Sequence, residues 1–217
     1  ISGNEKIGGI AGETSNSYIS YCINNGDITA SSDVGGITGY NSTETTIFAC
    51  DNNGVIKGSY DSVGGISGYS GRISQCNNYE TVSSLSDVGG IVGRGYYTVE
   101  SNNNYADIVG TRYVGGIVGY GSAKNCGNSG NITCTEGNYT GGISGNGTAK
   151  YCYNTGNITS SGGYTAGILG YGDAEYCYNT GSVNSDKYHV GGIVGCGNAK
   201  NSYNTADICE RKSKTDG

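Results

Sequence analysis

The chain has 217 residues, of which 42 are Gly and 20 are Tyr, and it contains no Pro, Met or Trp. Gly costs about 1 kcal/mol per helical site relative to Ala, and Asn, Ser and Thr divert backbone hydrogen bonds into turns. The composition therefore disfavours helices and predicts strands and turns. The net charge is -6 and the first basic cluster is Arg211, Lys212 and Lys214, so no nucleic-acid partner is expected.

The chain carries no sign of a membrane span or an export signal. No stretch approaches the roughly 18 consecutive apolar residues of a spanning helix, so no membrane insertion is expected in this segment. The repeat pattern begins by Ile7 and ends near Ile208, with little at either end to serve as a cap. Because repeat arrays need capping units, we expect the caps, the signal and the anchor to lie outside this segment.

Taken in chain order, the first predicted element is a Gly-Gly-Ile-x-Gly block at Gly8, which recurs every 25 to 29 residues. It returns at Gly35, Gly64, Gly89, Gly115, Gly141 and Gly191, and once as Ala-Gly-Ile-x-Gly at Ala166. The eight repeats begin near residues 7, 34, 63, 88, 114, 140, 165 and 190. One Ile stands at the same place in each of them: Ile10, Ile37, Ile66, Ile91, Ile117, Ile143, Ile168 and Ile193.

A second block, written Cys-x-Asn-x-Gly-x-Ile in its fullest form, follows in every repeat. Its fixed positions alternate with variable ones, which is typical of a strand-turn-strand path with one buried face. The Asn is present in all eight repeats: Asn24, Asn52, Asn78, Asn104, Asn128, Asn154, Asn179 and Asn204. The Cys is present in six repeats, with Asn102 and Ser202 in the other two: Cys22, Cys50, Cys76, Cys126, Cys152 and Cys177.

A unit of about 25 residues cannot bury its own apolar face, so the units must stack on one another. The sequence predicts an all-β fold, a single-stranded β-helix (β-solenoid) of eight rungs that covers residues 1–209 and is roughly 38 Å long. Residues 210–217 are predicted to be a charged C-terminal tail or linker. The connection between the two blocks is longer in the first four repeats, which predicts larger loops such as residues 13–18 and 41–46.

Stacking gives each column of equivalent residues a physical role. Buried Asn side chains can hydrogen-bond amide to amide along the axis, which predicts an Asn ladder. The column cysteines are expected to be buried, reduced thiols that act as small apolar fillers. The glycines are expected either to turn corners at positive φ or to let the backbone pack closely. Departures from the pattern predict a less regular fourth rung and a drifting last rung: Glu80, Asn102, Ala106 and Ala206.

The Val-Gly-Gly-Ile-Val-Gly segment is apolar on both alternating sets of positions, as at residues 114–119 and 190–195. Strands that are covered on both faces have this pattern. This ribbon is therefore expected either to be covered by the protein's own loops or to mediate self-association or a contact with another domain.

The motifs Val-Gly-Gly-Ile-Val-Gly and Cys-Tyr-Asn-Thr-Gly-Asn-Ile, the latter at residues 152–158, resemble the GLUG repeat over about 200 of the 217 residues. GLUG repeats are associated with bacterial surface proteins, including adhesin-like proteins and the non-catalytic region of IgA1-specific metallopeptidases. The resemblance implies a surface location and a scaffold or adhesion role. It carries over no catalytic residue, because the motif is structural.

The chain offers little for catalysis. A Ser-His-Asp or Cys-His site needs a histidine base, and the only histidine is His189, whose place is taken by Tyr113, Tyr139 and Tyr164 in preceding rungs. We interpret His189 as one more aromatic ring in an exposed stack. No His-Glu-x-x-His motif is present, so a zinc peptidase site is excluded from this segment. The chain is predicted not to be an enzyme and to need no cofactor.

The cysteines also argue against a metal site. The six column cysteines lie whole rungs apart and not in Cys-x-x-Cys pairs, which makes zinc binding unfavourable. Three further cysteines lie outside the column and are the candidates for greater reactivity: Cys134, Cys196 and Cys209.

Two surface features are candidate binding sites. Asp33, Asp61 and Asp87 lie at or near one column on successive rungs, where they could chelate a cation or a glycan, although turn Asp residues are also common for backbone reasons. Outward tyrosine columns suit a sugar or a protein partner, or simply stabilise the sheet. The predicted binding surface consists of Tyr151, Tyr153, Tyr176, Tyr178 and Tyr203.

The sequence therefore favours a non-catalytic stalk, spacer or adhesive module of a secreted or cell-surface bacterial protein, with a host protein, a glycan or a second copy as its partner. A non-catalytic region of a secreted peptidase is the alternative, which a His-Glu-x-x-His domain elsewhere in the full protein would indicate. A polysaccharide-active β-helix is a third hypothesis, and a cleft lined with clustered Asp and Lys or Arg would favour it.

Overall fold

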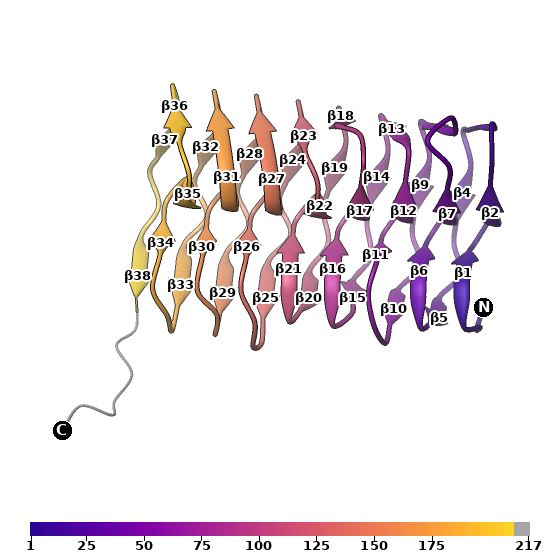
Figure 1. Ribbon diagram of the computed structural model, residues 1–217, viewed down its shortest axis with the longest axis horizontal. Coiled ribbons are helices and arrows are strands. Elements are labelled where there is room, and N and C mark those ends of the chain that lie inside the picture. The colour runs from indigo at the N-terminus through magenta and orange to yellow at the C-terminus, as the bar shows by residue number, and fades with distance from the viewer. Residues whose placement is uncertain (211–217) are drawn as a thin grey trace.

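The computed structural model describes residues 1–210, and every regular element within them is a β-strand. Figure 1 shows the coils stacked side by side along the long axis, so that the colour passes steadily from indigo to yellow. The predicted β-solenoid of eight rungs is confirmed. The predicted tail, residues 210–217, lies outside the described residues apart from Glu210, which ends the last strand. No helix long and apolar enough to cross a membrane occurs in the described part of the chain.

Each rung passes through four sheets in a fixed order, and each sheet collects equivalent strands from all eight rungs. The first sheet contains β1 (Glu5–Gly8), β6 (Ser32–Gly35), β11 (Val63–Gly64), β16 (Ser86–Gly89), β21 (Arg112–Gly115), β26 (Thr140–Gly141), β30 (Thr165–Ala166) and β34 (Val190–Gly191). After the glycine pair the chain enters the second and widest sheet, which has 14 strands.

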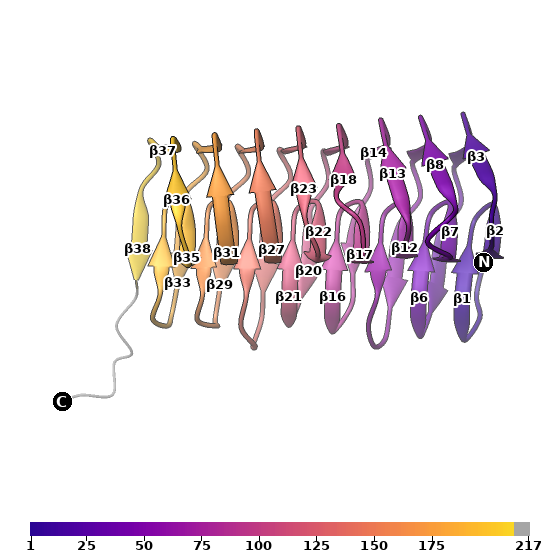
Figure 2. The same ribbon diagram turned by 45° about the horizontal axis from the view of Figure 1, so that its top comes forward.

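The second sheet has two halves, which merge where the connection between them is short. Its first half contains β2 (Ala11–Thr14), β7 (Thr38–Asn41), β12 (Ser67–Ser70), β17 (Val92–Gly95), β22 (Val118–Tyr120) and β35 (Val194–Cys196). Its second half, near the top of Figure 2, contains β3 (Tyr18–Ser20), β8 (Thr46–Phe48), β13 (Arg72–Ser74), β18 (Val99–Glu100), β23 (Ala123–Lys124) and β36 (Ala199–Lys200). Two seven-residue strands span both halves: β27 (Ser144–Lys150) and β31 (Leu169–Glu175).

The third and fourth sheets carry the second sequence block. The third sheet contains β4 (Ile23–Asn24), β9 (Asp51–Asn52), β14 (Asn77–Asn78), β19 (Asn103–Asn104), β24 (Gly127–Asn128), β28 (Tyr153–Asn154), β32 (Tyr178–Asn179) and β37 (Tyr203–Asn204). The fourth sheet contains β5 (Ile28–Ala30), β10 (Ile56–Gly58), β15 (Val82–Ser83), β20 (Ile108–Gly110), β25 (Ile132–Cys134), β29 (Ile158–Ser160), β33 (Val183–Ser185) and β38 (Ile208–Glu210).

Neighbouring rungs pair in parallel and in register, so equivalent residues lie over one another. Asn78 pairs with Asn52 on one side and with Asn104 on the other, and Ile56 pairs with Ile28 in the fourth sheet. The predicted columns are therefore real files of side chains. In the fourth rung Asn102 accepts the backbone N–H of Cys76 at 2.9 Å and keeps the spacing of the Cys column, but strand β18 pairs with β13 only through Ser74 and Glu100. The last rung also keeps its register, as Asn204 pairs with Asn179.

The interior is divided into two separate apolar cores. One core contains the Ile37, Ile47 and Cys50 columns, and the other contains the Ile28 and Val34 columns. Asn52 lies in sequence between Cys50 of the first core and Ile56 of the second, and its side chain packs against the second glycine of the pair, Gly36. The Asn–Gly contact therefore forms a waist between the two cores in every rung.

The waist explains why the glycine pair and the Asn occur together. A Cβ added to Gly36 would overlap both the Asn52 side chain and the Gly65 carbonyl oxygen of the next rung. Gly116 has the same relation to Asn128 and to Gly142. These glycines thus serve close packing, one of the two roles expected for them.

The tight corners are made by other residues. Two columns of non-glycine residues have φ between 49° and 72°, in the left-handed region that bulky residues rarely adopt. The first corner column contains Lys6, Asp33, Ser62, Asp87, Tyr113, Tyr139, Tyr164 and His189. The second contains Tyr21, Ala49, Gln75, Ser101, Asn125, Tyr151, Tyr176 and Asn201. Each such residue costs about 1–2 kcal/mol, which the stacking of the rungs must offset.

Candidate functional site

The Asn ladder predicted from the sequence is present. Each Nδ2 group donates one hydrogen bond to the Oδ1 of the next Asn, as from Asn128 to Asn154 at 2.7 Å, and seven such bonds link the eight residues. The same Nδ2 donates to the carbonyl oxygen two residues later, as from Asn128 to Gly130 at 2.8 Å. Asn52 to Asn179 are fully buried, so these bonds satisfy amides that have no access to water.

The Cys column has a polar role that the sequence interpretation missed. All nine cysteines lie within the described residues and are free thiols, and Cys22 is half-buried while the other five of the column are buried. The Cys50 thiol donates to the carbonyl of Phe48 and accepts the backbone N–H of Cys22 at 3.4 Å. Ser202 and Asn102 make the same acceptor contacts in their rungs, at 3.0 and 2.9 Å. The column therefore requires an acceptor, and not merely a small apolar side chain.

The pKa values of the column thiols shift in both directions. A hydrogen bond with a neighbouring thiol lowers the pKa of Cys126 and Cys177, and it lowers that of Cys50 to about 7. The hydrogen bond with Cys126 and burial raise the pKa of the Cys152 thiol, which keeps it protonated. Of the three cysteines outside the column, Cys134 is buried and donates to the carbonyl of Thr111, so it does not fit the expected greater reactivity. Cys196 is half-buried and Cys209 is exposed.

The predicted tyrosine surface consists of stacked rings. The ring centroid of Tyr178 lies 5.4 Å from that of Tyr153 and 5.4 Å from that of Tyr203, and the ring planes are nearly parallel. The rings of Tyr151 and Tyr176 stack in the same way, with centroids 5.1 Å apart. Rings in such a stack cover one another's faces and offer mainly their edges to a ligand. His189 stacks in the same way on Tyr164 at 4.5 Å, which confirms its interpretation as one more aromatic in a stack.

Tyr171 was not part of the predicted surface, and it differs from the stacked rings. Its ring is nearly perpendicular to that of Tyr139, at 89° and 6.0 Å, and it is 46% exposed. In its own column it lies between Asn146 and Cys196, so no ring stacks on it from the equivalent position of either adjacent rung. The signal in the sequence was a lone aromatic between non-aromatic neighbours in its column.

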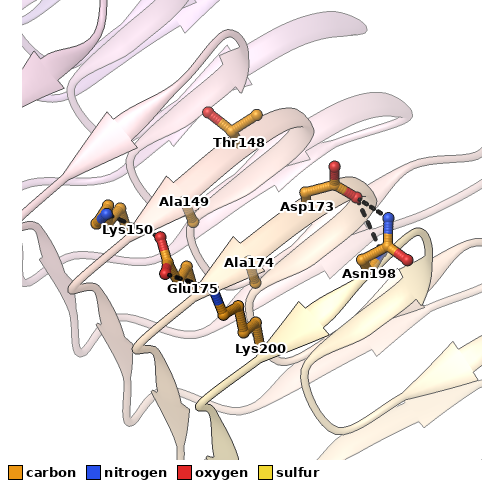
Figure 3. Close-up of a pocket in the computed structure, with 8 residues that line it drawn as sticks. All are labelled: Thr148, Ala149, Lys150, Asp173, Ala174, Glu175, Asn198 and Lys200. Atoms are coloured by element: carbon orange, nitrogen blue, oxygen red, sulfur yellow. Dashed lines mark hydrogen bonds and ion pairs between the residues drawn. The ribbon is translucent and has the colours of Figure 1, made fainter.

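A groove of about 390 Å³ lies across rungs six to eight and is lined by Thr148, Ala149, Lys150, Asp173, Ala174, Glu175, Asn198 and Lys200. Alternation along β27, β31 and β36 turns the alanines inward, where Ala149 and Ala174 are buried. Figure 3 shows the lysines and Glu175 on one side of these alanines and Thr148, Asp173 and Asn198 on the other. The two polar rows are therefore walls above a floor of backbone.

The walls are ordered by hydrogen bonds and ion pairs between rungs. Glu175 lies 2.8 Å from the Lys150 ammonium and 3.6 Å from that of Lys200. The hydrogen bond with Lys150 lowers the pKa of Glu175 and, in return, raises that of Lys150. On the other wall, the Oδ1 of Asp173 accepts both the backbone N–H and the Nδ2 of Asn198 at 2.9 Å.

The groove exists because the connection before the Cys column is short in these rungs. A single glycine at positive φ, such as Gly147 or Gly172, joins the two halves of the second sheet there. In rung two the equivalent connection is the longer segment 41–46, which confirms that the larger loops belong to the N-terminal half. A Cβ on Gly172 would overlap the carbonyl oxygen of Gly147, so both strand backbones remain close and unobstructed.

The three aspartates do not come together. Asp33 and Asp87 occupy the first corner column, but Ser62 has that place in rung three, and Asp61 precedes it. Asp87 is buried and lies 2.8 Å from the Arg94 guanidinium, a partner that the sequence analysis overlooked. Burial raises the pKa of Asp87 despite this ion pair. Within residues 1–210 no group of three or more His, Cys, Asp or Glu side chains could hold a metal ion.

The apolar ribbon is covered by the chain itself. Val88 and Val114 are buried in the second core, whereas Val92 and Val118 are buried in the first. The ribbon turns at the glycine pair, so the valine before the pair faces the second core and the valine after it faces the first core. Both alternating sets of positions are apolar for this reason. In these rungs the valines therefore offer no exposed surface for self-association, and the cover comes from the two cores and not from loops.

Comparison of the chain with models of protein families, with curated proteins and with solved structures finds no match.

Proposed function

We propose that the chain is a non-catalytic binding rod of a secreted or cell-surface bacterial protein, built from GLUG-like repeats. The uninterrupted Asn ladder supports a structural role, because it couples all eight rungs into one stiff unit. The variable outward columns, which the ladder does not constrain, provide a surface for a partner. The groove of rungs six to eight brings two carboxylates, two ammonium groups and an amide together on that surface.

A polysaccharide-active enzyme is the competing hypothesis, because the groove combines Asp173 and Glu175 with two lysines. A glycoside hydrolase needs one carboxylic acid whose pKa is raised, so that it can protonate the leaving group. Glu175 has the opposite property, because its ion pairs lower its pKa. The electrostatics therefore favour binding over hydrolysis.

The proposal is tested by immobilising the folded chain and measuring its binding to a panel of host extracellular proteins and glycans. An unrelated acidic protein of similar size is the control for charge. Binding of any member of the panel above this control is the expected result. A chain that binds no member of the panel would contradict the binding role and leave only a spacer.

A further inference from the structure

We propose that the groove of rungs six to eight binds a neutral oligosaccharide that lies along the rod axis, with the ring of Tyr171 as its stacking platform. The inference rests on the proposed binding function and names the ligand class and the residues. It follows from the charge of the walls, from their hydrogen-bonding groups and from the exposed ring of Tyr171, two residues before Asp173 on β31.

The charges of the groove balance. Lys150 and Lys200 contribute two positive charges, and Asp173 and Glu175 contribute two negative charges. Glu175 is paired with both lysines, so neither ammonium group is left as an uncompensated anion site. A polyanionic ligand needs a surplus of positive charge, whereas a hydroxyl-rich neutral ligand needs both donors and acceptors.

Both kinds of group remain on the walls. Asp173 uses its Oδ1 for Asn198, and its Oδ2 faces no hydrogen-bond donor among the described residues. The Asn198 Oδ1 is an acceptor on the same wall, and the remaining ammonium protons of Lys200 are donors on the opposite wall. Groups of this kind on adjacent rungs can accept from and donate to neighbouring hydroxyls of one sugar ring.

Tyr171 supplies the apolar contact. It lies on β31 two residues before Asp173, with only Gly172 between them in the chain, and its ring is exposed. The edge contact with Tyr139 holds the ring in place, and neither of its neighbours in the column carries a ring that could stack on it. The outer two of three strands are about 10 Å apart, which allows a chain of two or more sugar rings to lie along the groove.

The experiment measures the affinity of the whole chain for cellopentaose, mannopentaose and chitopentaose by titration calorimetry, with an oligogalacturonate of the same length as the anionic probe. We expect at least one neutral pentasaccharide to bind more tightly than the oligogalacturonate. Tyr171→Ala and Asp173→Ala should each weaken that binding about tenfold, a change of about 1.4 kcal/mol. Tyr171→Phe should keep it within about twofold, since the ring remains.

Tyr18→Ala is the matched control, because Tyr18 is also exposed but lies on β3 in the first rung, far from rungs six to eight, and it should leave binding unchanged. Thermal midpoints of all variants show that they are folded, and Tyr171→Phe tests the ring if Tyr171→Ala unfolds. Tighter binding of the oligogalacturonate, or equal losses in Tyr18→Ala and Tyr171→Ala, would overturn the inference. So would binding of host proteins without binding of any sugar, a result that leaves the proposed function intact. Release of shorter sugars would instead overturn the non-catalytic role.

Discussion

Replacing one interior rung of the Asn ladder should destabilise the whole rod. In Asn128→Ala the chain loses three side-chain hydrogen bonds, of 2.8 Å from Asn104, 2.7 Å to Asn154 and 2.8 Å to the Gly130 carbonyl. All three partners are left in a site that is closed to water, since Asn128 and its two ladder neighbours are fully buried. An unsatisfied buried group costs about 1–3 kcal/mol, so the free energy of unfolding should fall by about 3 kcal/mol or more.

The matched control is Asn204→Ala at the last rung. Asn204 is half-buried, and it accepts from Asn179 and donates to the Ala206 carbonyl. Because water can replace these bonds, this substitution should cost only about 1 kcal/mol. Equilibrium unfolding in urea, monitored by circular dichroism, gives both values from the transition midpoint and slope. Equal losses in the two variants would refute the idea that the buried amide chain stabilises the rod.

Three further predictions concern the waist, the Cys column and the first corner column. Gly116→Ala should lower the thermal midpoint, through overpacking that costs about 1–3 kcal/mol, because its Cβ would overlap the ladder amide. Gly95→Ala, whose nearest contact would be at 3.5 Å, should be tolerated, and the reverse order would contradict the waist. The free energy of unfolding in urea should be about 1 kcal/mol higher for Cys50→Ser than for Cys50→Val, because only the Ser side chain can accept the backbone N–H of Cys22. A Val variant that is more stable than the Ser variant would refute the acceptor role. Burial raises the pKa of the Asp87 carboxyl above 3.8. The folded state therefore binds the carboxyl proton more tightly than the unfolded chain does. The free energy of unfolding should accordingly fall as the pH rises from 3.8 through the raised pKa. Thermal midpoints of Asp87→Asn across this range should depend less on pH, and an unchanged dependence would count against Asp87 as its source.

The repeat made most of the fold predictable. A residue that recurs at one place in eight units must lie over itself when the units stack, and this alone predicted the Asn ladder, the Ile files and the parallel sheets. The larger loops of the N-terminal half followed from counting residues between the two blocks. The stacked position of His189 followed from the tyrosines at the same place in preceding rungs.

The candidate site was less predictable. The stacked tyrosines were chosen because they form columns, whereas Tyr171 is not stacked because its two neighbours in the column, Asn146 and Cys196, carry no ring. The ion pair of Asp87 with Arg94 joins residues whose proximity depends on the corner at Asp87 and on the reach of a long side chain. The spacing of the motif shows neither how exposed a tyrosine ring is nor which side chains form an ion pair.

The sequence by itself determined which residues share a column, because period and identity are repeated eight times along the chain. Only the tertiary structure decided which of the two cores each apolar column faces. The left-handed corners and the contact of Gly36 with Asn52 divide the interior into two cores, and they turn both faces of the Val-Gly-Gly-Ile ribbon inward. Direction depends on backbone dihedral angles at a few non-glycine residues, and those angles are set by packing between rungs rather than by the preference of any one residue.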